Sequence, residues 1–368
     1  MRQDKGWRDI RGESAIKFIV AMGLLTVALL WGGYVALERA LPSGERGGSP
    51  PPAASGPAPS ATAPETGDDS QMDAEARRRV DNAQSPFDGE RAYADLERVV
   101  GFGPRPAGSE ALEELREFMR ATLEAEGFDV WEHAFTADTP IGLIDMVNVV
   151  APIQGTEPGV IVLGNHYETK YYEDITFVGA NDGGSTTAWM LEMARVLGPE
   201  REGRSVWLCF FDGEESFEDW TEEDSLYGSR AFVGHLAQTG ELANIDAMVN
   251  VDMIGDCVLT IERDQGAPDW LQDIIWDEAS ALGHGEHFLD SENYVLDDHI
   301  PFRRAGVPAM VVIDFMYGGT PQTHVQYWHT EEDTLDKVCA QSLQVVGDVI
   351  YHALPRIDGA LDEMAQSS

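Results

Sequence analysis

The chain has 368 residues, of which 43% are apolar, enough for the packed core of one large domain plus appendages. Its formal net charge of −40 argues against a nucleic-acid partner, because the phosphates would be repelled. The three cysteines, Cys209, Cys257 and Cys339, are widely spaced, so the sequence predicts neither a cysteine metal cluster nor a disulfide framework.

The first predicted element is a membrane-spanning helix at residues 18–37. This stretch, FIVAMGLLTVALLWGGYVAL, contains no charge. It is long enough to cross the hydrocarbon core of a bilayer, which is about 30 Å thick. Five basic residues precede it: Arg2, Lys5, Arg8, Arg11 and Lys17. Residues 1–17 are therefore expected in the cytoplasm and the rest of the chain outside it, periplasmic or extracellular. A cleaved signal peptide is the alternative.

A tether and a catalytic domain follow the apolar helix. Residues 38–71 are rich in Pro, Ala, Ser, Gly and Thr, as in SPPPAASGPAPSATAPETG. Such a composition cannot bury enough apolar surface to fold, so we predict a disordered linker. The catalytic domain is expected over residues 72–368.

Within that domain, apolar strand-like segments alternate with amphipathic helices. Strands are predicted at residues 128–135, 146–152, 160–164, 205–211, 247–253 and 307–313. Helices are predicted at residues 91–100, 110–126, 185–197, 228–239, 268–282 and 338–354. This alternation predicts an α/β fold, a three-layer sandwich with a mostly parallel central sheet flanked by helices.

The most informative stretch is RSVWLCFFDGEESFEDWTEEDSLYGSR, residues 204–230. Its apolar run has the length and aromatic content of a buried strand, and the adjacent Glu214 and Glu215 follow directly after Asp-Gly. Side chains of neighbouring residues diverge, so one carboxylate can bind a metal while the other moves a proton. An isolated Glu-Glu pair is usually a solvated loop, so this interpretation depends on partners elsewhere in the chain.

Those partners are polar residues that follow the strand-like segments, where ligand sites of open α/β sheets collect. Together with one glutamate of the pair they form a set of five: His166, Asp182, Glu215, Asp252 and His329. Imidazole and carboxylate ligands in this combination suit zinc. Each residue alone is a weak signal, since a strand-end His or Asp is usually a cap or surface group. The five together predict a metal site.

The motifs NHYETK, GANDGGST, FFDGEE, NVDMIG and WHTEEDTLDKV resemble those of the zinc-dependent aminopeptidase family, which has a phosphorylase/hydrolase-like α/β fold. The resemblance covers residues 87–354. It implies two zinc ions that share Asp182. The other ligands would be His166 and Asp252 for one ion, and Glu215 and His329 for the second. The first glutamate of the pair would be the general base.

Three stretches are similar to the animal-type glutaminyl-peptide cyclotransferases, a branch of that family. They are the long spacer GEESFEDWTEEDSLYGSR, the segment DDHIPFRRAGVP at residues 297–308, and Trp328 directly before His329. This narrower resemblance implies a single zinc ion held by Asp182, Glu215 and His329. It also implies a hydrogen-bonded pair of carboxylates formed by Asp252 and Asp297.

The reaction implied by this branch converts an N-terminal glutamine of a peptide to pyroglutamate with release of ammonia. Zinc would polarise the γ-carbonyl, and the free α-amine would attack that carbon within the same molecule. Glu214 would carry the amine proton to the departing ammonia. Asp252 and Asp297 would orient the substrate or stabilise developing charge. The pocket walls are expected from Trp220, Trp328 and Ile313, with core packing as the alternative role of the tryptophans.

Three positions depart from the cyclotransferase pattern. Leu296 replaces a glutamine, Val311 replaces a histidine, and Asn165 stands at a position of the paired cysteines. A di-zinc aminopeptidase, in which metal-bound water attacks the first peptide bond, is therefore the alternative function. A non-catalytic binding module is a third hypothesis, disfavoured because none of the five ligand types is lost. Both enzyme hypotheses take peptide or protein N-termini as substrates.

Overall fold

The computed structural model describes residues 85–319 and 326–367. The predicted membrane helix at residues 18–37 and the linker at residues 38–71 lie outside the described residues. In the described part of the chain, no helix has the length and apolar character needed to cross a membrane. All described residues belong to the unit Asp68–Ser368.

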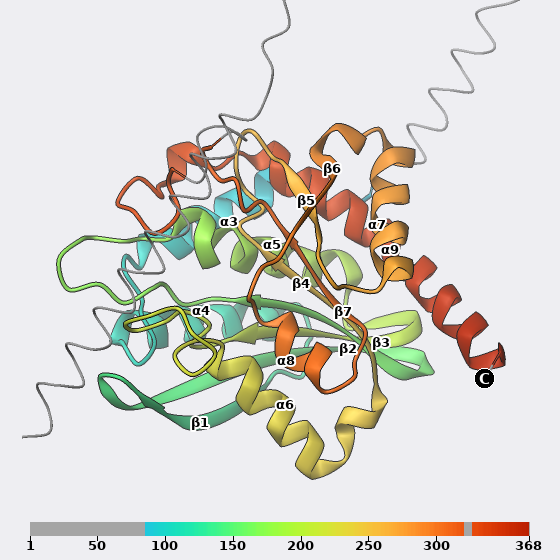
Figure 1. Ribbon diagram of the computed structural model, residues 1–368, viewed down its shortest axis with the longest axis horizontal. Helices are drawn as coiled ribbons and strands as arrows, with labels where there is room; N and C mark the ends of the chain where they lie inside the picture. Colours follow the sequence, from blue (N-terminus) through green and yellow to red (C-terminus); the bar gives the residue numbers. More distant parts are fainter. Residues whose placement is uncertain (1–84, 320–325, 368) are drawn as a thin grey trace, which may run out of the picture. The chain divides into compact units, whose positions relative to one another are not determined.

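The centre of this unit is a five-stranded mixed sheet (Figure 1). It contains β1 (Trp131–Thr139), β2 (Gly142–His166), β3 (Glu200–Phe211), β4 (Ile245–Asp252) and β7 (Ala309–Ile313). β1 pairs antiparallel with β2, whereas the β2–β4 and β4–β7 pairs are parallel. Two of the predicted strands merge in β2, and its two halves pair with β3 in opposite senses. Residues 149–153 of β2 pair with residues 210 to 206 of β3, in antiparallel order. Residues 160–166 pair with residues 205 to 211, in parallel order.

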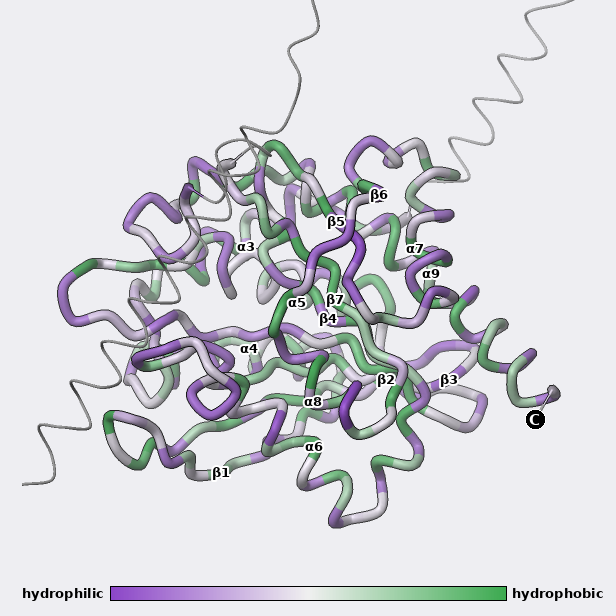
Figure 2. The backbone as a smooth tube through the Cα atoms, viewed as in Figure 1, coloured by the Kyte–Doolittle hydropathy of each residue, from purple (hydrophilic) through white to green (hydrophobic). Residues whose placement is uncertain are grey.

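Helices cover both faces of the sheet (Figure 1). A large apolar cluster joins one face to α3 (Gly89–Gly101), α4 (Glu110–Ala125), α5 (Thr186–Leu197), α7 (Asp269–Leu282) and α9 (Ala340–Ser367). A second cluster joins the other face to α6 (Tyr227–Thr239) and α8 (His299–Arg304) through Phe232 and Phe302. Apolar residues concentrate in the central strands (Figure 2). The prediction of an α/β fold with a mostly parallel sheet flanked by helices is confirmed.

Helix caps explain several of the boundaries. The Asp88 and Ser109 side chains accept hydrogen bonds from the backbone N–H groups of Arg91 and Leu112, which fixes the starts of α3 and α4. Glycine follows the last residue of α5, α6 and α7 in each case with positive φ. These signals are local, so the predicted ends of the same helices differ from the structure by only a few residues.

Some elements differ from the prediction. The small sheet of β5 (Ile261–Asp264) and β6 (Phe288–Asn293) was not predicted, because strands this short carry little periodicity. α9 continues through Pro355 instead of ending at residue 354. Proline removes one helical hydrogen bond, but Leu354 and Ile357 both remain buried, so the apolar face extends past it. β1 begins and ends a few residues later than predicted.

The prediction of no disulfide was wrong, because Cys257 is bonded to Cys339 across 82 residues of sequence. Cys257 lies in the loop after β4, and this loop packs against the segment that enters α9. The Cys339 amide donates to the Gly255 carbonyl at 2.9 Å, and Asp256 forms a β-bridge with Val338. Tertiary contact therefore brings together two cysteines whose spacing gave no signal. Cys209 is a buried free thiol.

Candidate active site

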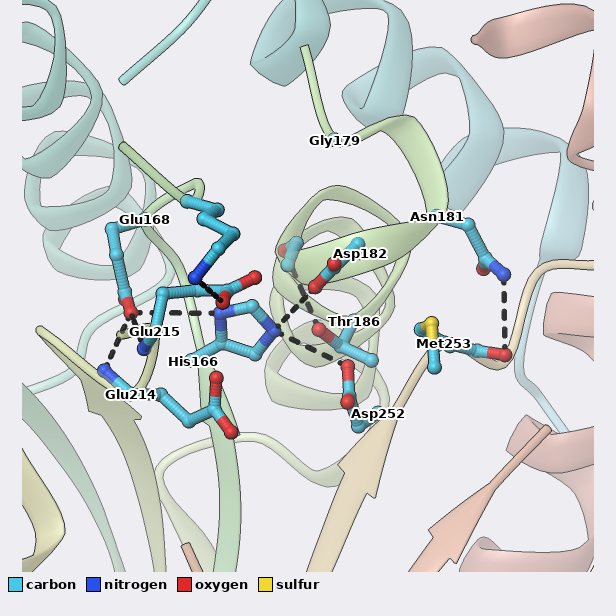
Figure 3. A network of polar contacts seen from close by, with 12 residues as sticks. His166, Glu168, Gly179, Asn181, Asp182, Thr186, Glu214, Glu215, Asp252 and Met253 are labelled. Atoms are coloured by element: carbon cyan, nitrogen blue, oxygen red, sulfur yellow. Dashed lines mark hydrogen bonds and ion pairs between the residues drawn. The ribbon is translucent and has the colours of Figure 1, made fainter. Parts of the chain in front are cut away.

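The parallel strands bring the predicted ligands to one edge of the sheet. His166 is the last residue of β2 and Asp252 the last of β4, while Glu215 follows β3. Asp182 lies in the short segment Ala180–Ser185 that leads into α5. His329 lies in the loop that precedes the final helix, with φ at +58°, a left-handed conformation that is uncommon for a residue other than glycine. Figure 3 shows His166, Asp182, Glu215 and Asp252 pointing toward one another.

Asp182 is shared by two groups of potential metal ligands, one with His166 and Asp252 and the other with Glu215 and His329. Its Oδ1 is 3.1 Å from His166 Nε2, and its Oδ2 is 3.4 Å from His329 Nε2. His166 Nε2 is also 3.2 Å from Asp252 Oδ1, and His329 Nε2 is 2.8 Å from Glu215 Oε1. In each group the three ligand atoms lie within 4.8 Å of one another. The structure thus brings together all five residues that the sequence singled out.

These residues fit a zinc ion. Asp182 and Glu215 are buried, and among the described residues neither Asp182 Oδ2 nor Glu215 Oε2 accepts a hydrogen bond. Their cationic neighbours are more distant, with His329 Nε2 at 3.4 Å and Lys170 Nζ at 3.7 Å. Buried carboxylate oxygens without hydrogen bonds are costly, and a bound cation offsets that cost. Carboxylate oxygen together with imidazole nitrogen is a usual ligand set for zinc. The group Asp182, Glu215 and His329 can hold one ion, and the group His166, Asp182 and Asp252 can hold another.

The site also contains carboxyl groups that hold protons readily. Burial raises the pKa of Glu214 well above its usual range; the His166 ring opposes this rise, and Asp297 adds to it. Burial and the neighbouring Asp252 also raise the pKa of Asp297. The raised pKa of Glu214 means that this carboxyl group takes up a proton more readily than an exposed glutamate does, as a general base requires.

The predicted carboxylate pair of Asp252 and Asp297 stays a prediction, because the hydrogen bonds of both residues in the structure are to other groups. Asp252 faces His166 instead. Asp297 Oδ1 accepts from Asn250 Nδ2 at 2.9 Å and from the Asp298 amide, and its other oxygen is buried without a partner. The two carboxyl groups are nevertheless close enough for the charge of Asp252 to raise the pKa of Asp297. An unpartnered oxygen on Asp297 is available to a ligand in the cavity.

A cavity of about 240 Å³ opens beside these groups. Its polar lining contains Asp182, Glu214, Glu215, Asp252 and Asp297. Its apolar lining includes the three predicted wall residues Trp220, Trp328 and Ile313, together with Met253, Tyr294, Val295, Leu296 and Phe315. The Trp328 ring stacks on the His329 ring, with centroids 3.8 Å apart. Both tryptophans thus lie at the cavity and beside a predicted ligand, rather than only within the core.

Comparison with known proteins agrees with this geometry. Residues 148–354 match the model of peptidase family M28. The chain belongs to this family. It is 30% identical over 249 residues to the glutaminyl-peptide cyclotransferase of Bos taurus, covering 58% of this chain and 67% of the relative. It is 30% identical over 286 residues to that of Gloydius blomhoffii, covering 66% of this chain and 74% of the relative.

Several solved structures are also similar. The crystal structure of Acidobacteriales bacterium glutaminyl cyclase has a TM-score of 0.71 and 38% identity, over 82% of this chain and 100% of that one. Porphyromonas gingivalis glutaminyl cyclase has a TM-score of 0.66 and 27% identity, over 73% and 98%. A Zn-dependent exopeptidase from Parabacteroides distasonis shares the fold at 22% identity, with a TM-score of 0.66 over 72% and 96%. The resemblance read from the sequence is confirmed.

Two buried carboxylates of this M28 chain were missed at the level of sequence. Glu168 Oε1 accepts from the amides of Glu214 and Glu215, at 2.5 and 3.1 Å (Figure 3). Asp333 accepts from the amides of Asn181 and Asp182, at 2.8 and 3.1 Å. Both lie in motifs quoted for the resemblance, HYETK and WHTEEDT, but nothing in either motif marks its acidic residue as a backbone support. Glu168 therefore holds the backbone at Glu214 and Glu215, and Asp333 holds the backbone at Asp182.

Proposed function

We propose that this chain is a zinc-dependent glutaminyl cyclase, which converts the N-terminal glutamine of peptides to pyroglutamate and ammonia. The observation that carries the proposal is the cavity beside the metal-ligand group. Ligands, a buried glutamate and two tryptophans share one small space there. The similarity to glutaminyl cyclases over most of the chain supports the same activity.

The proposed chemistry joins the α-amine nitrogen to the γ-carbonyl carbon and breaks the carbon–nitrogen bond of the side-chain amide. A zinc ion held by Asp182, Glu215 and His329 would supply Lewis-acid polarisation of the carbonyl. Glu214 accepts the proton that the α-amine loses and passes it to the departing ammonia, which its raised pKa favours. Because the nucleophile and the carbonyl belong to one molecule, holding them in the reactive geometry provides much of the acceleration.

The cavity walls also decide which nucleophile attacks. Trp220, Trp328 and Ile313 present apolar surface to the site, and such surface would disfavour water beside a bound glutamine. Attack by water would produce glutamate instead of the ring. Asp252 and Asp297 would orient the neutral α-amine by accepting hydrogen bonds from its N–H groups. The proposed walls therefore favour cyclisation over hydrolysis.

A di-zinc aminopeptidase is the second candidate function, and one observation favours it. His166, Asp182 and Asp252 converge as closely as the first group does, so the chain retains the ligands for a second ion. With two ions at the site, bound water could be directed at the first peptide bond. The number of zinc ions therefore separates the two functions.

The test combines metal content and activity on one sample. Zinc per purified chain is counted, and ammonia release from a glutamine peptide is compared with amine release from leucine and alanine anilides. About one zinc ion per chain with ammonia release is the result expected for the cyclase. About two ions with anilide cleavage and no ammonia would reject it and leave the aminopeptidase.

We also propose that the catalytic domain lies outside the cytoplasm, held by the helix predicted at residues 18–37. The Cys257–Cys339 bond supports this location, because disulfides persist in oxidising compartments. The natural substrates would then be exported peptides and proteins. Thiol labelling of freshly broken cells under denaturing conditions should modify only Cys209 in the mature protein. Labelling of all three cysteines would contradict the proposed location.

A further inference from the structure

Arg105 is a fully buried arginine behind the metal-ligand residues. It lies between α3 and α4 and has no solvent exposure. Among the described residues its side chain donates only to backbone carbonyls: Nε to Tyr167 at 3.1 Å, Nη1 to Val178 at 2.6 Å and Nη2 to Gly179 at 3.0 Å, with a longer contact to Gly103 at 3.5 Å. Tyr167 directly follows the ligand His166, and Gly179 directly precedes the segment that carries Asp182. One guanidinium thus ties two ligand-bearing segments together.

The backbone of Arg105 strengthens this connection. Its amide donates to Thr169 Oγ1 at 3.0 Å, and its carbonyl accepts from the Thr169 amide at 3.2 Å. The main chain of the arginine is therefore fixed to the same segment that its side chain contacts. A guanidinium suits this role because its donors are arranged in a planar fork that can reach several acceptors at once.

The charge of Arg105 is unusual for its environment. Buried arginines normally pair with a carboxylate, yet within the described residues Arg105 forms no ion pair. Burial lowers its pKa to about 10, and the more distant carboxylates of Asp333, Asp182 and Glu168 act in the opposite direction. Its positive charge therefore offsets part of the repulsion among the carboxylates of the site.

The segment that carries Asp182 needs such support because it is not regular helix. Gly179 and Gly183 have positive φ, and Asp182 has ψ of 106°. Arg105 holds the carbonyls of Val178 and Gly179, while Asp333 holds the amides of Asn181 and Asp182. A kinked backbone is thereby fixed from both sides.

We propose that Arg105 is a positioning residue for the metal site: by holding the carbonyls of Val178 and Gly179 it fixes Asp182, the ligand that both proposed groups share, before an ion binds. The inference rests on the proposed zinc-dependent function only in requiring that zinc binds at these ligands. It does not depend on which reaction follows. Arg105 contacts neither the proposed ligand atoms nor the cavity.

The test compares Arg105→Met and Arg105→Lys with a matched control, Arg204→Met. Arg204 is also a buried arginine, but it pairs with Asp246 and Asp362 and lies outside the site. Three quantities are measured on the full chain: the zinc dissociation constant by chelator competition, amide exchange of residues 178–184 in zinc-free protein, and the melting temperature. The first two would not change if Arg105 had only a general structural role.

We expect Arg105→Met to weaken zinc binding by about 10–100-fold, the usual range for groups that orient metal ligands. Exchange of residues 178–184 should accelerate in the zinc-free variant. Arg105→Lys should give a zinc affinity and an exchange rate between those of Arg105→Met and wild type, because lysine keeps the positive charge but lacks the planar set of guanidinium donors. Arg204→Met should lower the melting temperature while leaving zinc affinity and this exchange unchanged.

Wild-type zinc affinity and exchange in Arg105→Met would overturn the proposal, whatever its melting temperature. If that variant does not fold, Arg105→Lys decides by the same two measurements. The outcome is independent of the proposed reaction: a wild-type protein that binds zinc but releases no ammonia would reject the cyclase and leave this inference intact.

Discussion

Glu214→Gln is expected to lower the rate of pyroglutamate formation by about 10²–10⁴-fold, the usual contribution of a general acid–base group. Glutamine has nearly the same shape as glutamate but cannot accept the proton of the α-amine. Zinc content should stay at the wild-type value, because the proposed ligands are Asp182, Glu215 and His329. Ammonia release under saturating substrate, measured beside zinc per chain, checks both parts.

Glu192→Gln is the matched control for this variant. Glu192 is also buried, but it lies in α5, pairs with Arg91 and Arg195, and does not line the cavity. Its replacement should affect stability and leave zinc content and turnover rate close to wild type. A near-normal rate in Glu214→Gln would show that another group moves the proton.

Asp182→Ala is expected to abolish zinc binding altogether. Asp182 belongs to both of the proposed ligand groups, His166–Asp182–Asp252 and Asp182–Glu215–His329. Losing it leaves each group with only two ligands, which is too few for a stable zinc site. Elemental analysis after dialysis against a weak chelator measures the loss. Retention of wild-type zinc by this variant would place the metal elsewhere.

His166→Ala, analysed beside Asp182→Ala, reports how many ions are bound. If the chain holds a single ion at Asp182, Glu215 and His329, zinc content should not change in His166→Ala. If it holds two, the content should fall by one ion per chain. This difference separates the cyclase from the aminopeptidase without measuring either activity, so it is independent of the substrates chosen.

The five candidate ligands could be predicted from sequence because His166, Glu215 and Asp252 come at the ends of apolar strands and because all five lie in motifs that resemble those of the family. The carboxyl ends of parallel strands meet at one edge, so the ends of β2, β3 and β4 had to bring His166, Glu215 and Asp252 together. The starts and ends of helices could also be predicted, because capping residues are local signals. The short strands β5 and β6 were missed, because four to six residues carry too little hydrophobic pattern to indicate a strand.

Sequence by itself therefore determined the α/β fold, the family and the groups that meet at the site, because these depend on local pattern and on motifs. Only the tertiary structure decided which long-range contacts support them. Arg105 acts on carbonyls up to 74 residues away, and Cys257 bonds to a cysteine 82 residues away. Such contacts depend on how loops pack across the sheet edge, and neither partner carries a local signal of the other. The hydrogen bond that the buried Asp297 accepts from Asn250, 47 residues away, is another long-range contact that the sequence did not predict.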